Sequence, residues 1–200
     1  MTRIASTALV PGLAVAVLAG ARPAPERYEI DPAHTYIGFT AKHMLVMNVR
    51  GRFNRFSGHI TLDPQDITKS SADVTIEAAS IDTGNERRDE HLRSADFFEA
   101  EKYPTIRFVS RRVEKQAESL TLVGDLIIRD VTREVAIPFE LTSPVAAANR
   151  KSIGVEASLR INRFDYGLTW NRTIETGGLV VGEEIRIDLK VEAHVAAAGE

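Results

Sequence analysis

The feature that most constrains the fold is an alternation of apolar and polar residues with a period of two. The run near the C-terminus shows it clearly, because Ile185, Ile187 and Leu189 alternate with Arg186 and Asp188. Successive side chains of a β-strand point to opposite faces, so such a run predicts a strand with one buried face. Comparable runs cover residues 36–42, 55–62, 73–78, 106–108, 120–129, 134–141, 153–162 and 185–195. About eight strands of this kind predict an antiparallel sheet that hides one side.

Closing this sheet into a barrel is the simplest way to hide its apolar face, although a sandwich of two sheets would also satisfy the alternation. Several runs reach about eleven residues, and long tilted strands with few breaks favour a barrel. Pro138 lies inside one run and lacks a backbone N–H, so it is tolerated only at an edge, a bulge or the rim. We therefore expect an all-β protein built as an antiparallel eight-stranded barrel, with one short helix.

The helix is predicted where the alternation stops, over residues 82–94. This segment is polar, and Thr83 and Glu86 have the spacing of a capping box. Leu92 and the following Phe97 give it one apolar side. A short helix lying across a barrel mouth fits this pattern.

Residues 1–21 are predicted to be a cleavable signal peptide. A short basic start leads into an apolar run that ends in a small-x-small motif, which places cleavage after Ala21 or, as the second choice, after Ala19. An uncleaved membrane anchor is the alternative. The run is shorter than the roughly 20 residues that a membrane span requires, and it contains Pro11 and Gly12. Cleavage is therefore the favoured interpretation, and it implies export.

Residues 22–200 are predicted to form a single domain, because no shift in composition divides them. The chain contains no cysteine, which excludes disulfides, thiolate metal sites and a cysteine nucleophile. Its 25 basic and 28 acidic residues give a net charge of -3 and are spread along the chain, so a nucleic-acid partner is not expected. The mature chain shows no transmembrane segment.

No motif predicts an enzyme, a metal site or a cofactor. The chain lacks a Gly-x-Ser-x-Gly elbow, a Gly-rich phosphate loop and two histidines at zinc-hydrolase spacing. Among the five histidines, His59, His91 and His194 fall on polar faces and are interpreted as surface residues. His34 and His43 remain candidates, either as buried rings satisfied by their neighbours or as ligand contacts.

Arginines gather at residues 50–55 and again at residues 87–88. Guanidinium forks suit a phosphate or carboxylate, so Arg50 and Arg52 could bind the anionic head of a ligand. The alternative is ion pairing with the acidic residues of segment 89–96.

The predicted inner faces also contain small residues, namely Ala41, Gly58, Ala78, Gly124, Ala157 and Ala193. Small side chains pointing into a barrel of about eight strands leave volume that is not filled. An apolar void of this kind suits a lipid chain. The alternative is that small residues merely match the taper of a filled barrel.

Many ordered segments resemble one family. These are DPAHT at 31–35, residues 39–43, VRGRF at 49–53, residues 56–58, 79–84, 88–98, 103–108 and 124–126, INRFDYG at 161–167 and VGEEI at 181–185. Together they make the mature chain similar to the YceI-like proteins, which are lipocalin-like periplasmic polyisoprenoid-binding proteins. The resemblance implies an apolar tunnel inside the barrel, a periplasmic location, and binding or carriage of a polyisoprenoid or similar long-chain amphiphile without catalysis.

Strand phase then suggests which residues contact the lipid: Phe39, Ile60, Ile76, Phe108, Leu122, Leu126, Ile137, Phe139, Val155, Leu159 and Leu189 along the tunnel, with Leu168 and Trp170 at one mouth. The candidates for head-group contacts are His34, His43, Arg50 and Arg52. Two other functions stay open: a hydrolase or isomerase acting on such a lipid through His34 or His43, and a filled structural stress-protein barrel. A homodimer is also left open.

Overall fold

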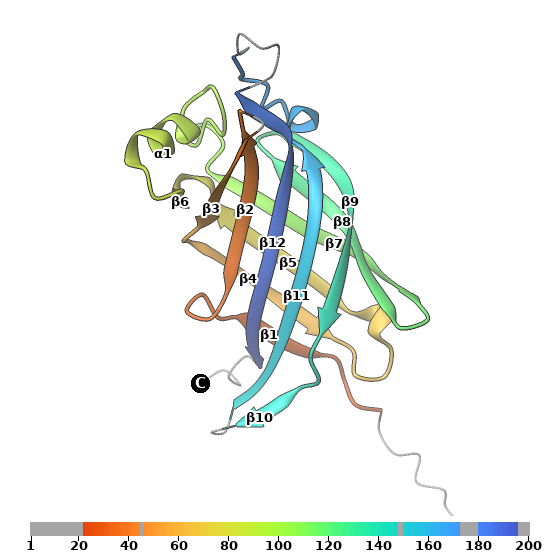
Figure 1. The fold of residues 1–200 in the computed structure, drawn as a ribbon. Helices are drawn as coiled ribbons and strands as arrows, with labels where there is room; N and C mark the ends of the chain where they lie inside the picture. The colour runs from red at the N-terminus through yellow and green to blue at the C-terminus, as the bar shows by residue number, and fades with distance from the viewer. Residues whose placement is uncertain (1–21, 45, 148–149, 173–179, 196–200) are drawn as a thin grey trace, which may run out of the picture.

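The structure is a computed structural model that describes residues 22–44, 46–147, 150–172 and 180–195. Within these ranges the chain is mostly β-strand (Figure 1). The strands are β1 (Glu26–Ile30), β2 (Tyr36–His43), β3 (Met47–Phe53), β4 (Phe56–Leu62), β5 (Ser71–Glu77), β6 (Ile81–Asp82), β7 (Thr105–Gln116), β8 (Ser119–Ile128), β9 (Val131–Leu141), β10 (Val145–Ala147), β11 (Arg150–Asn162) and β12 (Val181–Val195). The described helices are α1 (Glu86–Arg93) and the short 3-10 helices η1 (Ile67–Lys69), η2 (Ala78–Ser80) and η3 (Arg163–Tyr166).

Eight of the strands form a closed antiparallel barrel. Around the wall the order is β12, β1, β4, β5, β7, β8, β9 and β11. The ring closes where β11 pairs with β12, from Ser152 opposite His194 to Asn162 opposite Glu184. The predicted antiparallel eight-stranded barrel with a short helix is thereby confirmed.

The strands outside this ring extend one wall. β2 follows β1 along the same edge of β12, β3 pairs with β2, and the short β6 pairs with β3. The alternation of apolar and polar residues did not predict β3, because the central inner position of this strand is Gly51 and the apolar signal there is weak. The glycine is required by packing, since a Cβ atom on Gly51 would lie 2.4 Å from the Phe39 ring.

The predicted helix is present, but the predicted capping box is wrong. The helix begins after Asn85, whose side chain caps it by accepting a hydrogen bond from the Arg88 backbone N–H at 3.0 Å. Thr83 lies before the cap, and its hydroxyl donates to the buried carboxylate of Asp89. Gly84 separates the two with φ of 73°, a left-handed conformation that favours glycine.

Pro138 lies where its missing N–H is tolerated. It sits opposite Thr121 of β8, while the pairing of β9 with β11 begins only at the next residue, Phe139. The proline therefore occupies the margin of the β9–β11 contact, consistent with the expectation that it needs an incompletely paired position.

Buried apolar residues form two clusters at opposite ends of the barrel. One lies near α1 and η3 and includes Phe53, Ile81, Phe97, Tyr166 and Leu168. The other consists of Tyr28, Ile30, Leu62, Ile153 and Ala193, at the end where β1 meets β12. The barrel is thus packed with apolar side chains at both ends.

Candidate functional site

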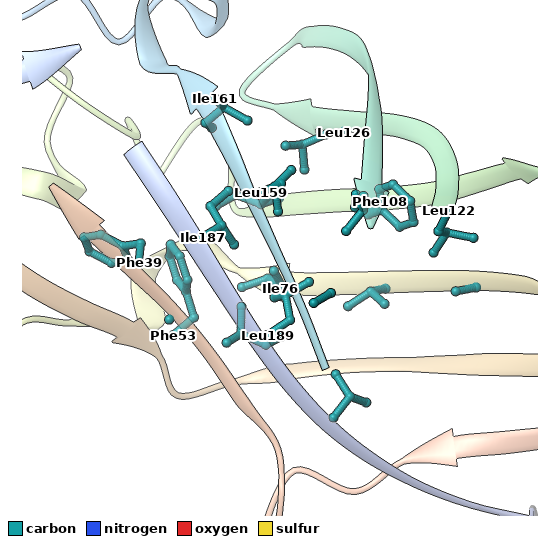
Figure 2. A pocket seen from close by; sticks show the side chains of 18 of the residues that line it. Phe39, Phe53, Ile76, Phe108, Leu122, Leu126, Leu159, Ile161, Ile187 and Leu189 are labelled. Atoms are coloured by element: carbon teal, nitrogen blue, oxygen red, sulfur yellow. The ribbon is translucent and has the colours of Figure 1, made fainter. Parts of the chain in front are cut away.

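A cavity runs through the interior of the barrel. The inner-face residues of β12, such as Ile187 and Leu189, line it together with those of β11, such as Leu159 and Ile161 (Figure 2). The strand phase explains this arrangement, because alternate residues of both strands point inward. The outward neighbours on β12 are charged residues such as Arg186 and Asp188.

The cavity is large and elongated. Its volume is about 260 Å³, far above the roughly 10–15 Å³ that a cavity needs in order to hold one water molecule. Val181 and Val191 both line it, and they lie roughly 30 Å apart along β12 at about 3.3 Å per residue. These dimensions suit an elongated chain better than a compact ligand.

The cavity wall is almost entirely apolar. Among the described residues that line it, the polar side chains are those of Ser70, Ser71, Arg163 and Tyr166. A polar ligand would lose its hydrogen bonds with water and regain few of them here. An apolar chain gives up no hydrogen bonds on entry and gains hydrophobic burial, so the wall selects for an apolar occupant.

The space comes from fewer small residues than the sequence suggested. Ala41 and Ala157 do line the cavity. Gly58 and Gly124 serve another purpose, because a Cβ atom on either would lie 2.4 Å from a backbone oxygen of the paired strand. Ala78 and Ala193 are packed into the buried clusters, with 1% and 0% exposure.

The residues predicted to contact lipid can now be placed. All of them line the cavity except Trp170: Phe39, Ile60, Ile76, Phe108, Leu122, Leu126, Ile137, Phe139, Val155, Leu159, Leu168 and Leu189. Trp170 instead packs against His91, with ring centroids 4.7 Å apart, and against Phe97 at 5.3 Å. Lipid contact by these residues stays a prediction. For Trp170 the contact would be indirect, through Phe97, which lines the cavity.

Part of the wall comes from residues that strand phase did not identify. Leu92 of α1 and the following Phe97 and Phe98 close one side of the cavity, together with Phe53 and Ile81. The sequence carried one signal for them, the apolar side of the segment after residue 82. What it lacked was the docking of that segment onto the barrel.

Arg163 is the charged residue that the sequence analysis missed. Its side chain is buried, with 4% of the residue exposed, and it lines the cavity near η3. Burial lowers the pKa of its guanidinium. The alternation ends at Asn162, and an isolated arginine after a strand would ordinarily be read as solvated, so no local pattern identified it.

Backbone carbonyls surround this guanidinium. Its Nε donates to the Gly182 oxygen at 2.9 Å, Nη2 to Val181 at 3.1 Å, and Nη1 to Trp170 at 3.0 Å and to Leu168. These bonds tie the segment after η3 to the start of β12. Arg163 therefore acts as a structural tie at this end of the cavity.

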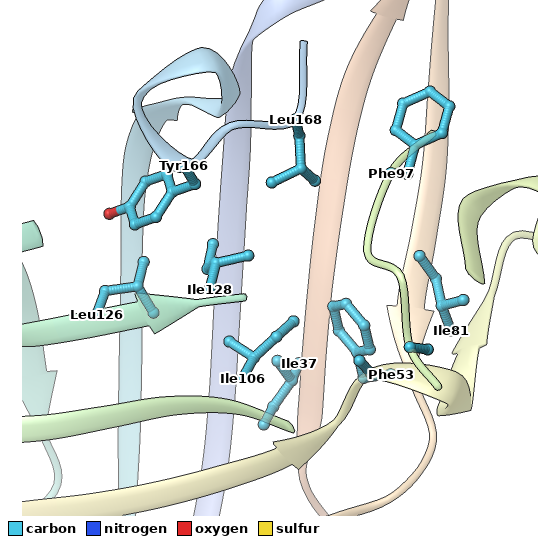
Figure 3. Packing of buried hydrophobic residues seen from close by; sticks show 11 residues of the cluster. Ile37, Phe53, Ile81, Phe97, Ile106, Leu126, Ile128, Tyr166 and Leu168 are labelled. Carbon is cyan, nitrogen blue, oxygen red and sulfur yellow. The ribbon is translucent and has the colours of Figure 1, made fainter. Parts of the chain in front are cut away.

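Apolar packing completes the closure at the same end. Figure 3 shows Phe97 and Leu168 facing Phe53 and Ile81, with Tyr166 nearby. Burial raises the pKa of Tyr166 to about 12, so its phenol is neutral at physiological pH. The end of the cavity near α1 is thus formed by packed side chains around one hydrogen-bonded cation.

The arginines proposed as head-group contacts lie outside the cavity. On β3 the side chains of Val49 and Phe53 face inward on the same side as position 51, so Arg50 and Arg52 face outward. Arg52 lies 3.8 Å from Asp82, and Arg50 lines a separate hollow on the outer surface. Arg55 pairs with Glu77 rather than with the acidic segment 89–96. Arg50 and Arg52 therefore do not line the cavity, and head-group contact by them stays a prediction.

Neither histidine candidate lines the cavity. His34 is exposed, and its Nδ1 lies 2.9 Å from the Asp31 carboxylate. His43 pairs with Val181, the lining residue at the start of β12, so it lies at the end of the cavity although it does not line it. The Asp31 carboxylate also forms a hydrogen bond with His194 Nε2 at 2.8 Å, and only 14% of the His194 side chain is exposed. The interpretation of His194 as a solvated surface residue is therefore wrong.

A pH dependence follows from Asp31 and His34. The hydrogen bond to Asp31 raises the pKa of His34, and the bonds from His34 and His194 lower the pKa of Asp31. The stability that His34 contributes is fully present below its unfolded pKa of about 6.5 and is lost as pH rises through its higher folded pKa. The stability that Asp31 contributes is present above its unfolded pKa of about 3.9 and is lost as pH falls through its lower folded pKa. His34→Gln should therefore cost more stability at about pH 6 than at about pH 9.

Urea unfolding at the two pH values measures this difference. Asp31→Asn provides the matched background, because it removes the acceptor while keeping a side chain of similar size. In that background His34→Gln should cost the same at both pH values. An equal pH dependence with and without the Asp31 carboxylate would contradict the coupling.

The described part of the chain shows neither a metal-binding cluster nor a membrane-spanning helix. No group of three or more His, Asp or Glu residues there could hold a metal ion. No helix among the described residues is both long enough and apolar enough to cross a membrane.

Comparison with known proteins gives a consistent family. A model of the YceI-like domain matches residues 28–193. The UPF0312 protein SAS2572 of Staphylococcus aureus is 33% identical over 171 residues, which cover 84% of this chain and 98% of the relative.

Solved structures show the same fold. BcnA of Burkholderia cenocepacia superposes with a TM-score of 0.72 at 24% identity, covering 82% of this chain and 98% of that one. A polyisoprenoid binding domain from Saccharophagus degradans has a TM-score of 0.64 at 17% identity, covering 84% and 98%. At these identities the likeness establishes the fold alone.

Proposed function

Because this chain belongs to the YceI-like family, we propose that it binds or carries a polyisoprenoid or similar long-chain amphiphile inside its barrel, in the periplasm and without catalysis. One observation carries the proposal: an elongated interior cavity of about 260 Å³ with an almost wholly apolar wall. Burial of alkyl surface, at about 0.8 kcal/mol per methylene, supplies the affinity. The structural likeness to a domain described as polyisoprenoid binding supports this choice of ligand class.

The same cavity supports carriage over the two alternatives. A filled structural barrel would leave no space of this size between its end clusters. A lipid-modifying enzyme acting through His34 or His43 would need those rings beside the ligand, and neither lines the cavity. Among the residues that do, Ser70, Ser71, Arg163 and Tyr166 carry the polar groups, and the Arg163 guanidinium is already engaged by backbone oxygens.

The proposed periplasmic location rests on residues 1–21, which lie outside the described residues. Mass measurement of the protein from fractionated cells of its native host tests it. A periplasmic chain that starts at residue 22, or at residue 20 for the second cleavage choice, is the expected result. A full-length chain in the cytoplasmic or membrane fraction would contradict export and cleavage.

Extraction of bound lipid is the direct test of the ligand. Protein purified from its native host without detergent should release one class of long-chain lipid in near-stoichiometric amount when extracted with organic solvent and analysed by mass spectrometry. A folded protein that yields no such lipid, and that also fails to take up polyprenol from detergent micelles, would refute the proposal.

A further inference from the structure

Exposed apolar side chains gather at the turn between β2 and β3. Met44 is 43% exposed, Val46 76% and Met47 63%, and these three are among the few large apolar residues that the described chain leaves exposed. We call Met44, Val46 and Met47 the β2–β3 tip. Single exposed apolar side chains are common on soluble proteins, but contiguous ones are not. A cluster of them therefore usually marks an interaction site.

The backbone holds the β2–β3 tip in a defined shape. Met44 has a φ of 47°, in the left-handed region that bulky residues rarely adopt. Its N–H donates to the Val180 oxygen at 2.9 Å, and the Val46 N–H donates to His43 at 3.1 Å. An unfavourable conformation of this kind persists where the surroundings impose it. The exposure of the tip is therefore built into the fold.

The tip stands at one end of the cavity. Ala41 of β2 and Val181 of β12 line the cavity, and Val181 pairs with His43, the last residue of β2. Figure 1 shows β2 ending and β3 beginning beside the start of β12 at the upper end of the barrel. A surface that met the tip would therefore lie close to the end of the cavity.

Basic side chains flank the tip. Lys42 and Arg50 are exposed and line one hollow on the outer surface beside it. Arg172 is also exposed. Its backbone oxygen accepts a hydrogen bond from the Val180 N–H, and the Val180 oxygen accepts the one from Met44. The tip is thus an apolar point with cations placed around its base.

Among the described residues, the acidic side chains at the start of β12 and in this hollow are engaged. The Glu184 carboxylate pairs with Arg160, Asp188 pairs with Arg186, and Glu183 accepts a hydrogen bond from Asn162 at 3.4 Å. Within the described part of the chain, Lys42 and Arg50 therefore remain available to an external anion. Apolar side chains surrounded by lysine and arginine are the usual arrangement for docking at an anionic lipid surface.

We propose that the β2–β3 tip docks this end of the barrel onto an anionic phospholipid membrane. Met44, Val46 and Met47 enter the acyl region, while Lys42, Arg50 and Arg172 meet the phosphates. A protruding turn can enter a bilayer, because the bilayer deforms around it. A second copy of the chain would instead need a flat face to pack against. Transfer of a lipid between membrane and cavity rests on the proposed function, whereas docking itself does not.

Vesicle flotation tests the docking. The chain from residue 22 onward, which contains every described residue, is mixed with vesicles of phosphatidylcholine alone or of phosphatidylcholine with phosphatidylglycerol. Binding to the anionic vesicles should be at least ten-fold tighter than to the neutral ones and should weaken with salt. Replacing Lys42 and Arg50 by Gln should cost about five-fold for each cation.

The apolar contribution is tested by Met44→Ser, Val46→Ser and Met47→Ser together. This variant should lose at least ten-fold in vesicle binding and remain folded, because the three side chains are exposed. The matched control is Val145→Ser on β10, a residue that is 60% exposed outside the tip. The control should bind as the parent does.

Three results would overturn the proposal. They are a parent chain that does not float with anionic vesicles, a tip variant that floats as well as the parent, and a parent dimer, seen by light scattering, that the tip variant abolishes. Failure of the proposed function looks different: the parent would still dock, but neither parent nor tip variant would take up polyprenol from micelles. If both proposals hold, the tip variant keeps its equilibrium lipid content and loses only the rate of transfer from vesicles.

Discussion

Replacing Ala157 with tryptophan is expected to reduce lipid binding at least 100-fold while leaving the barrel folded. Ala157 lines the cavity from the middle of β11, opposite Leu189 of β12 and Phe139 of β9. An indole at this position must occupy the space that an alkyl chain would fill. Displacing about four methylenes at about 0.8 kcal/mol each removes about 3 kcal/mol, which corresponds to more than a 100-fold loss of affinity.

Lipid content per protein, measured by extraction and mass spectrometry, gives the first readout, and polyprenol uptake from micelles gives the second. Ser158→Trp is the matched control, because the next residue on β11 is exposed and paired with Asp188. It adds the same side chain to the outer face and should load normally. A folded Ala157→Trp protein with full lipid content would show that the ligand lies elsewhere.

Replacing Arg163 with methionine is expected to destabilise the protein by about 3–5 kcal/mol, the range seen when a buried charged interaction is broken. The methionine removes donors from the carbonyls of Gly182, Val181, Trp170 and Leu168. Buried acceptors left without partners cost free energy, and the link between η3 and β12 is lost. For a chain of this length, a loss of about 4 kcal/mol lowers Tm by about 8–16 °C.

Calorimetry and urea unfolding measure this loss, with Arg163→Lys as the intermediate case because it keeps the charge and loses the planar fork. Arg160→Met is the control: its ion pair with Glu184 is exposed on the outer face, so its removal should cost less than about 1 kcal/mol. Arg163→Met with a stability like that of Arg160→Met would contradict the role of Arg163 as a structural tie.

Several features of the fold followed from local pattern. The alternation along residues 153–162 and 185–195 predicted the two strands whose pairing closes the barrel, and it predicted their inward faces. The interruption after residue 82 predicted the helix. β3 escaped the analysis because Gly51, required by the nearby Phe39 ring, diluted its apolar face.

The candidate site was predicted in part. Strand phase is a property of the backbone, so it identified wall residues such as Leu122 and Leu159 without knowledge of which strands pair. It gave no information about segments outside the strands. Hence it missed Leu92, which α1 brings to the cavity. Trp170, which was expected at one mouth, packs against Phe97 and does not line the cavity.

The positions of polar residues were the hardest to predict, because their surroundings depend on distant neighbours. Arg50 and Arg52 are close in sequence to the inward-facing Phe53, yet the alternation turns them to the outside. Arg163 was given no role of its own in the INRFDYG segment, and carbonyls from two separate segments accept its hydrogen bonds.

The sequence by itself determined the class of fold, the inward faces of the strands and the family, because periodicity and ordered motifs are local properties of the chain. Only the tertiary structure decided that the interior keeps a cavity, that Arg163 ties one end of it, and that the apolar β2–β3 tip stands beside that end. The physical reason is that volume, burial and hydrogen-bond partners depend on segments far apart in the chain, and local alternation carries no record of which segments meet.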